Sequence, residues 1–450
     1  MDYAIPKFIS DISKTLQKEG HEAYVVGGAV RDLIMGRVVD DWDFTTNATP
    51  EATLKMFVGS FYDNAYGTVM FPVDELETPI DITTYRTEHG YSDSRRPDEI
   101  KWGETLEGDL QRRDFTINAI ALKIDGEKTS LVDPHKGRKD LDDKLIRTVG
   151  DPDERFAEDA LRMMRAVRIA AELNFEIENK TKKAIQKNSK LILKISGERV
   201  RDEFFKILLS PKPNKGVTKL KEVGLLGKIF PDLDACFGVD QKSPQRHHVD
   251  DVGTHLLKSL KECRSENLIT RFATLIHDIG KPQTRNVTDE GVVTFYNHEV
   301  VSARIAKNIA NRFRLSNIQK DTLWKLVRYH QFSVTEKQTD TAIRRFIRNV
   351  GIELVPEILE LRRADRLGSG AKETSWRTED FKKRLIEVQK QPFTVHDLKI
   401  SGDDVMRELS IKPGPEIGIV LNQLFDQVVE KGADNTKKSL LKELKKFKGG

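Results

Sequence analysis

Cysteine and long apolar runs are scarce in the sequence, and each shortage excludes a class of protein. The 450 residues include two cysteines, Cys236 and Cys263, which lie far apart and without Cys-x-x-Cys spacing. We therefore expect buried thiols, not a disulfide framework or a thiolate zinc site. No apolar run is long enough to span a bilayer, and the first residues lack the pattern of a signal peptide. These absences predict a cytoplasmic protein.

A strong charge of either sign is also missing, as are internal repeats and low-complexity segments. Charged residues make up 32% of the chain, but the formal net charge is only +4. This balance permits nucleic-acid binding without arguing for it, because a local basic patch matters more than the total charge. The length exceeds that of a single ordinary core, so about two to four domains are expected.

One stretch near the N-terminus combines an apolar strand, a glycine pair and two aspartates. Gly27-Gly28 lets backbone N–H groups approach a phosphate, and a helix that starts just after it would direct its positive end there, beside Arg31. Asp41 and Asp43 are two residues apart in a strand pattern, so both carboxylates should lie on one face. Such carboxylates repel each other unless a cation lies between them. The stretch therefore predicts a site for a metal ion and a phosphate.

Two later segments carry charged residues that suit this site. Residues 79–86 follow a strand pattern, and Asp81 within them is a candidate third metal ligand; the alternative is an edge-strand acid that faces water. Arg113 and Asp114 precede an apolar helix pattern, where they form either a solvated helix start or a clamp for a triphosphate and a ribose. The polar segment 88–108 has little periodicity and is predicted to be a mobile loop.

From residue 151 the pattern becomes helical, and charged residues recur at helical spacing. Asp159 and Arg162 are three residues apart, so a continuous helix would place them on one face with Arg165 behind them. Taken alone, this spacing indicates no more than a surface ion pair.

Histidines concentrate between residues 247 and 330. Imidazole nitrogens together with carboxylate oxygens suit a divalent transition metal, and several such residues come from separate predicted helices. A lone buried histidine is usually structural, but a set of this size predicts a metal site. The candidate ligands are His255, His277, Asp278 and Asp365. Two further histidines, His298 and His330, would make the site dinuclear if they also bind.

The chain ends in an amphipathic, lysine-rich helix pattern. Its lysines would follow a phosphate backbone, or they would form an ordinary solvated face. They are Lys437, Lys438, Lys442, Lys445, Lys446 and Lys448.

Taken in order, these motifs resemble those of one family, the class II (bacterial-type) tRNA nucleotidyltransferases that add CCA, whose head is shared with bacterial poly(A) polymerases. Residues 27–43 are similar to the first family motif, residues 112–119 to the second and residues 158–162 to the nucleotide-selecting motif. Residues 95–97 resemble part of the flexible loop that CCA-adding enzymes keep and CC-only enzymes lack. The later histidines are similar to HD-type metal-dependent phosphohydrolase domains.

The resemblance covers essentially the whole chain and implies a multidomain α+β fold: an α/β head with a mixed sheet, followed by mostly helical regions. The implied domains are a nucleotidyltransferase head (1–148), a helical neck for base selection and RNA binding (149–210), a helical connector (211–244), an HD metal-binding domain (245–370) and a helical tail that contacts tRNA (371–450).

The implied activity is template-independent addition of CCA to the 3′ end of tRNA from CTP and ATP by two-metal nucleotidyl transfer. Asp41 and Asp43 would hold two Mg²⁺ ions, with Asp81 completing one of them, and a divalent transition metal would occupy the HD domain. The residues implied to contact the nucleotide are Gly27, Gly28, Arg31, Arg113, Asp114, Asp159, Arg162, Arg165 and Arg168.

Base selection has a donor and acceptor account. Cytosine and adenine both offer an exocyclic amino donor beside a ring-nitrogen acceptor, which Asp159 and Arg162 complement, whereas uracil and guanine present the reverse pattern. The alternatives are a poly(A) polymerase that uses only ATP, an HD-type phosphohydrolase as the main activity, and a protein that only binds RNA. A hydrolytic HD activity is also expected as a second function beside CCA addition.

Overall fold

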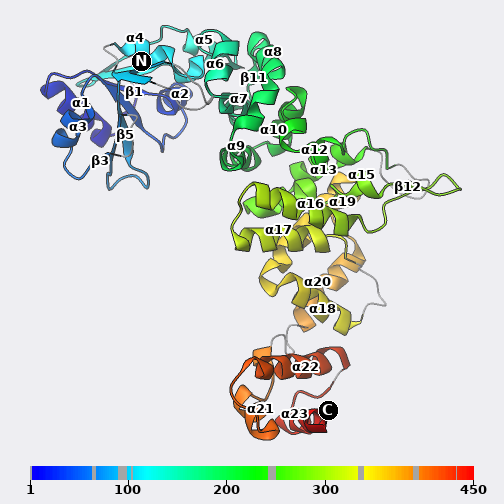
Figure 1. Cartoon of the computed structure of the whole chain (residues 1–450). Coiled ribbons are helices and arrows are strands. Elements are labelled where there is room, and N and C mark those ends of the chain that lie inside the picture. Colours follow the sequence, from blue (N-terminus) through cyan, green and yellow to red (C-terminus); the bar gives the residue numbers. More distant parts are fainter. Residues whose placement is uncertain are drawn as a thin grey trace. The chain divides into compact units, whose positions relative to one another are not determined.

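The structure, a computed structural model, consists of two compact units, the first made of Met1–Ala235 with Arg312–Arg314 and the second of Cys236–Asn311 with Leu315–Gly450. It describes residues 3–62, 67–89, 99–102, 105–241, 250–332, 339–388, 395–431 and 433–449. Within these residues, no helix has the length and apolar character needed to cross a membrane. The expected multidomain α+β class is confirmed (Figure 1). The finer division at residues 148, 210, 244 and 370 stays a prediction.

A seven-stranded mixed sheet forms the head of the first unit, in the order β3-β4-β5-β2-β1-β8-β9. The strands are β1 (Ala23–Val26), β2 (Asp43–Thr46), β3 (Phe61–Tyr62), β4 (Thr68–Phe71), β5 (Ile80–Thr84), β8 (Ala121–Asp125) and β9 (Lys128–Val132). β2 and β5 are parallel, and the other neighbours are antiparallel. The parallel register places Asp43 directly beside Asp81.

Short helices pack around this sheet. They are α1 (Lys7–Lys18), α2 (Gly28–Ile34), α3 (Pro50–Met56), α4 (Leu106–Gln111), the 3₁₀ turn η1 (Thr116–Asn118) and α5 (Gly137–Asp142). α1 buries Ile9, Ile12 and Leu16, which lie on one face of the helix. α3 begins at Pro50, and the Thr49 hydroxyl accepts a hydrogen bond from the Ala52 N–H, which caps that helix.

The segment predicted as a mobile loop over residues 88–108 is regular at both ends, so that prediction was wrong there. β6 (Arg86–His89) and β7 (Glu99–Trp102) form an antiparallel pair, and α4 follows. Pairing between the two ends satisfies their backbone groups although the sequence shows little periodicity. The arginine pair and proline at residues 95–97 lie outside the described residues.

The rest of the first unit is helical apart from a short parallel pair, β10 (Leu145–Ile146) with β11 (Glu176–Ile177). Its helices are α6 (Pro152–Glu158), α7 (Leu161–Leu173), α8 (Asn179–Asn188), η2 (Ser189–Lys194), α9 (Gly197–Leu209), α10 (Pro213–Glu222), α11 (Leu226–Ile229) and α12 (Pro231–Asp234). Four aromatic rings, Phe204, Phe205, Phe230 and Phe313, pack together in this region.

The second unit is almost entirely helical. Its first elements are α13 (Val252–Glu262), α14 (Leu268–Ile276), α15 (Lys281–Thr284), β12 (Asn286–Val287), β13 (Val293–Thr294), α16 (His298–Arg312), α17 (Asn317–Tyr329), α18 (Asp340–Val350), η3 (Ile352–Leu354), α19 (Val355–Gly368) and α20 (Trp376–Val388). Good caps define several helix starts; at α17, Ser316 and Gln319 form a capping box. Apolar faces of α13, α14, α17 and α19 pack around one centre.

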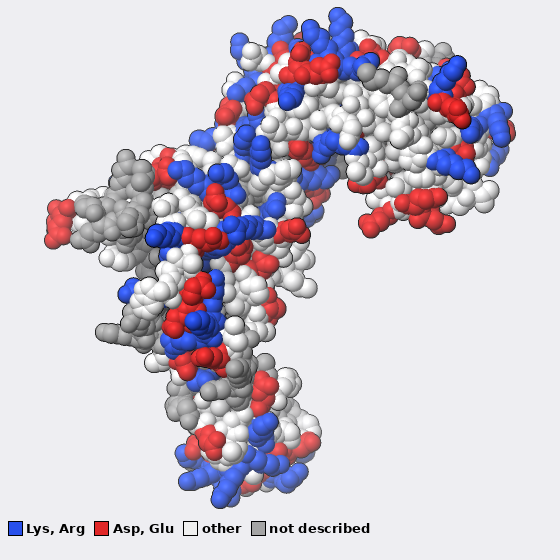
Figure 2. All heavy atoms as spheres, turned by 180° about the vertical axis from the view of Figure 1, so that it is seen from behind, with Lys and Arg blue, Asp and Glu red and all other residues white. Residues whose placement is uncertain are grey.

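The C-terminal helices have a small apolar core of their own. They are η4 (Val395–Asp397), α21 (Gly402–Leu409), α22 (Pro415–Lys431), α23 (Lys437–Leu444) and η5 (Lys445–Gly449). Leu398, Val405, Leu424 and Leu440 belong to the buried cluster between them. Lys and Arg side chains gather over this end of the chain in Figure 2, where the sequence predicted a basic helix.

Candidate active site and metal centre

Three aspartates lie near the start of β2. Asp43 is the first residue of β2 and Asp81 its in-register neighbour on β5, while Asp41 lies just before the strand. Trp42 and Phe44 are buried, at 3% and 1% exposure, whereas Asp41 is exposed and Asp43 half-buried. The predicted alternation is therefore present. β5 lies between β4 and β2, so Asp81 is not an edge-strand acid.

The electrostatics of these carboxylates favour a divalent cation. Burial raises the pKa of Asp43 to about 7, and the charges of Asp41 and Asp81 add to the rise, although Arg113 opposes it. A second positive charge near Asp43 would relieve this repulsion. Carboxylate oxygens are the ligands that Mg²⁺ prefers, and Mg²⁺ is commonly held by few protein carboxylates together with substrate phosphates. The donor set therefore fits Mg²⁺.

The glycine turn after β1 lies against these carboxylates. Gly27 has φ of 77°, a left-handed conformation that favours glycine. A Cβ at Gly27 would lie 3.1 Å from Asp43 Oδ2 and 3.5 Å from Arg113 Nη1. The absent side chain therefore leaves space between an acid and an arginine. The helix expected just after the glycine pair, α2, begins within the pair at Gly28, where a Cβ would be 3.5 Å from Arg31 Nη2.

Arg31 is held in place by neighbouring polar groups. Its guanidinium donates to Asp32 (3.1 and 2.7 Å) and to the Asn118 side-chain oxygen (3.0 Å). Asn118 is the last residue of η1, the short turn that follows Arg113 and Asp114 in the sequence. The helix expected beyond residue 115 is only this 3₁₀ turn, because the chain continues into β8. The expectation of a helix was wrong, because the apolar residues of this segment pack against the sheet and do not form one face of a helix.

Arg113 and Asp114 are mostly buried, which excludes the solvated helix start. Arg113 Nη2 donates to Asp109 Oδ2 (3.1 Å), and its Nε is buried without a partner among the described residues. Asp114 is 8% exposed and forms an ion pair with Arg165 (2.7 Å). Burial raises the pKa of Asp114, but Arg165 and Arg162 outweigh burial and hold it below its usual value. Asp114 therefore carries a charge beside α7.

The structure corrects the placement of Asp159. The helix expected over residues 158–168 breaks at Asp159, which has φ of −140° and ψ of 105° between α6 and α7. Asp159 Oδ1 accepts a hydrogen bond from the Leu161 N–H (3.0 Å), and Oδ2 pairs with Arg199 (2.9 Å). A local hydrogen bond from the backbone to the aspartate side chain thus competes with helical continuity. Asp159 and Arg162 therefore do not share one helical face.

The three arginines of α7 bind different groups. Arg162 pairs with Glu158 and donates to the carbonyl oxygens of Arg155 (3.2 Å) and Arg112 (3.3 Å). Arg165 binds Asp114, as described above. Arg168 pairs with Glu203 (2.7 Å) and Glu172 (3.1 Å). The helix is therefore tied to the head through two arginines and to α9 through the third.

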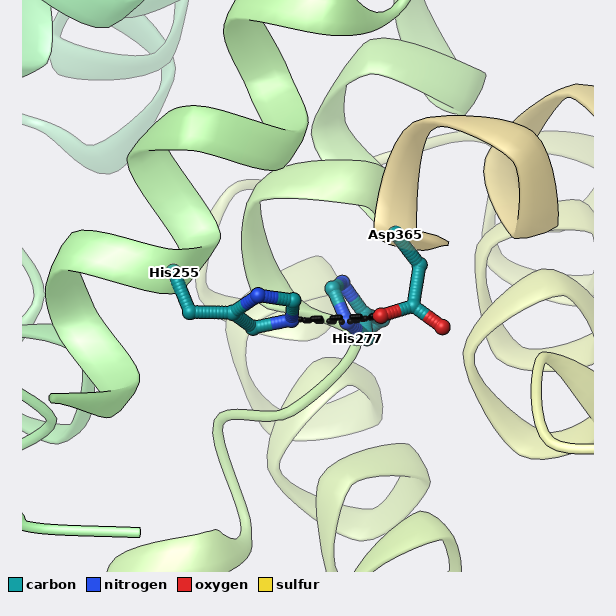
Figure 3. Close-up of side chains that lie close together, drawn as sticks. All are labelled: His255, His277 and Asp365. Atoms are coloured by element: carbon teal, nitrogen blue, oxygen red, sulfur yellow. Dashed lines mark hydrogen bonds and ion pairs between the residues drawn. The ribbon is translucent and has the colours of Figure 1, made fainter. Parts of the chain in front are cut away.

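The histidine cluster forms a second candidate metal centre, in the second unit. His255 on α13, His277 after α14 and Asp365 on α19 converge (Figure 3). His255 Nε2 is 3.2 Å from His277 Nε2 and 3.2 Å from Asp365 Oδ1. Asp278 Oδ2 lies 3.3 Å from His277 Nε2. All four predicted ligands are therefore brought together.

The two histidines left open by the sequence face the other oxygen of Asp278. Asp278 Oδ1 is 3.0 Å from His298 Nε2 and 3.4 Å from His330 Nε2. His277, Asp278 and His330 also meet the spacing of a metal-binding group. Asp278 therefore lies between two sets of ligand atoms.

Backbone carbonyls fix the tautomer of three of these histidines. The Nδ1 atoms of His277, His298 and His330 donate to the carbonyl oxygen three residues earlier, at 2.8, 2.8 and 2.7 Å. Each ring then presents Nε2 toward the cluster. Such a bond to the second nitrogen is the usual arrangement at metal-bound histidine. The chemistry of the donor set therefore fits a transition metal.

A cleft of about 630 Å³ opens onto this centre. Its lining includes Asp278, His298, His330 and Asp365, together with the cationic side chains of Arg362 and Arg366. Lys281 also lines it and binds Asp278 Oδ2 at 2.6 Å. Metal ligands beside cations suit an anionic substrate.

The sequence indicated some partners of these residues only poorly. Asp109 binds Arg112 and Arg113, and Arg199 binds Asp159. Both Asp109 and Arg199 lie in stretches of sequence with many other charged residues. Neither has a spacing that distinguishes it from a surface residue. A buried charge becomes apparent only when the packing is known.

Comparison with known proteins gives a consistent result along the chain. Residues 23–147 match the Poly A polymerase head domain, residues 174–237 the probable RNA and SrmB-binding site of polymerase A, and residues 283–444 the putative tRNA nucleotidyltransferase domain 2. The CCA-adding enzyme of Pediococcus pentosaceus is 34% identical, with 98% of this chain and 99% of that protein covered. The CCA-adding enzyme of Lactococcus lactis subsp. lactis is 33% identical, with 96% and 94% covered.

A solved structure agrees with these relatives. The crystal structure of the Bacillus stearothermophilus CCA-adding enzyme in complex with CTP is 27% identical, has a TM-score of 0.69, and covers 97% of this chain and 96% of that one. The similarity extends over the head, the helical regions and the tail. The chain therefore belongs to the family of CCA-adding enzymes.

Proposed function

We propose that this protein adds CCA to the 3′ end of tRNA from CTP and ATP, with release of pyrophosphate. The observation that carries the proposal is the convergence of Asp43, Asp81, the Gly27 turn and Arg113 around one space. The full-length relatives are CCA-adding enzymes, and the Bacillus stearothermophilus relative binds CTP. These relatives favour CCA addition over an ATP-only poly(A) polymerase and over HD hydrolysis as the main activity.

Asp41, Asp43 and Asp81 would hold Mg²⁺, which when bound activates the RNA 3′-hydroxyl and neutralises charge on the pyrophosphate. The residues of the chain then supply position. Gly27 and Gly28 let the backbone approach the phosphates, and Arg31 and Arg113 direct their guanidinium groups toward them. Asp114 would accept a hydrogen bond from the ribose, and Arg165 keeps that carboxylate charged and oriented.

Asp159 and Arg162 would select the base. The Asp159 carboxylate accepts from the exocyclic amino group of cytosine or adenine, and Arg162 donates to the ring nitrogen beside it. Uracil or guanine would leave both groups unpaired, which is costly in a partly buried site. Glu158 orients Arg162 and Arg199 orients Asp159. Arg165 and Arg168 would add contacts from the same helix.

The direct test is incorporation of CTP, and then ATP, into tRNA that lacks its 3′ end. We expect the purified protein to add two C residues and one A. Asp41→Ala should abolish this activity while fold and tRNA binding are retained, because Asp41 is exposed. Substantial transfer by Asp41→Ala in Mg²⁺ would contradict the metal assignment.

Base selection is tested separately with Asp159→Ala. This variant should lose discrimination of CTP and ATP against UTP more than it loses triphosphate affinity. Asp153→Ala is a matched control, because Asp153 is a half-exposed acid of α6 that binds Lys187. Unchanged selectivity in Asp159→Ala would rule out the pairing account.

A second candidate function is hydrolysis of phosphoesters by the HD centre. His255, His277, Asp278 and Asp365 would hold a divalent transition metal, and the two-sided contacts of Asp278 support a second ion at His298 and His330. The cations Arg362 and Arg366 in the adjoining cleft suit a phosphate. The chain's acids and histidines would then orient a water molecule toward that phosphate.

This second function predicts two separable sites. Asp278→Ala should lose bound metal and phosphomonoester or cyclic-phosphate hydrolysis, while CTP incorporation stays unchanged. Asp250→Ala is the control, since Asp250 is a half-exposed acid of the same unit that pairs with Lys258. Wild-type protein that retains no metal after dialysis, as measured by elemental analysis, would contradict the assignment.

The lysines of the C-terminal helices are proposed to contact the tRNA backbone. Lys437 and Lys446 also pair with Asp404 and Glu443. The remaining charges would make tRNA binding fall with rising salt.

A further inference from the structure

Asp109 is an almost fully buried acid at the centre of the head's charged groups. It lies on α4, is 1% exposed, and accepts from both arginines that follow that helix. Arg112 donates to Oδ1 through Nε (2.9 Å) and Nη2 (2.5 Å), and Arg113 donates to Oδ2 (3.1 Å). The Thr45 hydroxyl, on β2, also donates to Oδ2 (3.2 Å). Asp109 therefore connects the metal-binding strand to both arginines.

Arg113 lies between two competing acids. Its Nη2 is bound to Asp109, while its Nη1 and Asp43 Oδ2 lie within 3.5 Å of the same point, the place where a Cβ of Gly27 would be. Without Asp109, Asp43 is a strong acceptor close to this flexible cation. A guanidinium bound to Asp43 would occupy a metal ligand and would also lose the orientation that a triphosphate needs.

We propose that Asp109 is a positioning residue: it holds Arg113 away from Asp43, so that Asp43 is left for the metal ion and Arg113 for the triphosphate. This inference rests on the proposed nucleotidyl transfer. Arg113 keeps one buried nitrogen, Nε, without a partner among the described residues. This nitrogen is therefore available to an acceptor atom of a bound ligand, since buried donors are usually bonded.

The anchoring of Asp109 is rigid enough for this role. Leu106 and Leu110, on the same helix, are buried against Tyr85 and Val26 in one apolar cluster. Thr105 caps the helix by accepting from the Gly108 N–H (3.3 Å). The carboxylate is thus fixed both by its helix and by the Thr45 hydroxyl of β2.

The test measures equilibrium binding of CTP and of CMP to the full-length protein without tRNA, at several Mg²⁺ concentrations. Asp109→Asn should weaken CTP binding about 10- to 100-fold at low Mg²⁺. High Mg²⁺ should restore part of the loss, because the ion competes with Arg113 for Asp43. CMP binding should change little, since CMP lacks the phosphates that Arg113 would contact.

A milder variant covers the case in which Asp109→Asn fails to fold. Thr45→Val removes one hydrogen bond to Asp109 and leaves all charges in place, so we expect CTP affinity to fall about two- to tenfold. Asp140→Asn is the matched control. Asp140 is 4% exposed in the same head and accepts from a threonine, Thr116 (2.6 Å), and an arginine, Arg147 (3.1 Å).

The outcomes separate this inference from the proposed function. If Arg113→Met leaves CTP affinity unchanged, the proposed phosphate contact of Arg113 is wrong. If Arg113→Met weakens CTP binding but Asp109→Asn and Thr45→Val alter neither CTP affinity nor its Mg²⁺ dependence, the positioning role alone is wrong. Equal losses for CTP and CMP, or an equal loss in Asp140→Asn, would show general damage to the head and would also overturn it.

Discussion

The two candidate metal centres of this chain are built in opposite ways. The head centre contains only carboxylates, on neighbouring strands of one sheet, and Asp41 is exposed. The histidine centre, proposed above as an HD metal site and called the HD centre below, combines buried histidines and aspartates from separate helices. Each oxygen of Asp278 faces its own histidines. The first has too few protein ligands to bind Mg²⁺ tightly without substrate phosphates, whereas the second resembles a complete cage. We therefore expect the HD metal to remain bound when the head metal exchanges.

The largest expected effect separates the two centres by activity. Asp43→Asn should lower nucleotide addition about a thousandfold or more, because metal stabilisation of transition-state charge supplies several kcal/mol. Hydrolysis at the HD centre should not change. The measurement is CTP incorporation beside phosphomonoester hydrolysis in the same preparation. Loss of both activities together would show that the centres are not independent.

A second prediction compares the centres by stability. In metal-free protein, Asp278→Ala leaves His277, His298 and Lys281 without their shared buried counter-charge. We expect a loss of about 3–5 kcal/mol in the stability of the second unit. Asp41→Ala, at an exposed position, should cost about 0.5 kcal/mol or less. Urea unfolding followed by tryptophan fluorescence measures both, and similar losses would contradict the comparison.

A third prediction concerns pH and metal binding at the HD centre. Burial opposes protonation of His277, but Asp278 and Asp365 outweigh burial and raise the pKa of His277 to about 10. A metal must therefore displace a proton from Nε2 below that pH, and affinity should rise about tenfold per pH unit between pH 6 and 8. Competition with a chelator measures this dependence. A flat profile would indicate that His277 is neutral before metal binds.

The smallest expected effect is a pH-dependent response of the head to Mg²⁺. The pKa of Asp43 is raised to about 7 in the folded protein, against about 4 when unfolded. Between about pH 4 and 7 the folded state therefore keeps a proton on Asp43 that the unfolded state releases. The free energy of unfolding falls as pH rises through this range. Mg²⁺ should raise Tm by about 2 °C more at pH 8 than at pH 6. Asp43→Asn should remove this difference.

Local patterns indicated the backbone setting of the head aspartates, while their binding of a metal ion stays a prediction. Asp41 and Asp43 are close in sequence, and the apolar residues that alternate with them, Trp42 and Phe44, are buried. The glycine turn directly follows β1, the strand that pairs with β2. The register with Asp81 depends on a parallel pairing that sequence spacing does not contain. The sequence pattern therefore predicted the strand that carries Asp81, but not which strands lie beside it in the sheet.

The errors arose where a side chain or a distant segment overrode a local pattern. Asp159 lies in the break between α6 and α7, where it accepts a hydrogen bond from the Leu161 N–H and binds Arg199. The helical spacing with Arg162 therefore did not lead to a shared face. The apolar run after Asp114 has a composition that predicts a helix. In the structure it forms the short turn η1 and then strand β8. Similarly, nothing in the sequence distinguishes buried Asp109 from the exposed acids around it.

The parallel pairing of β2 with β5 has a consequence for how this head can diverge. Antiparallel strands would need only a tight turn, but parallel strands require a crossover, and here it contains α3, β3 and β4. The ladder, not the length of that crossover, sets the distance between Asp43 and Asp81. Insertions and deletions in the crossover can therefore accumulate at the outer edge of the sheet while the spacing of the two acids is inherited unchanged.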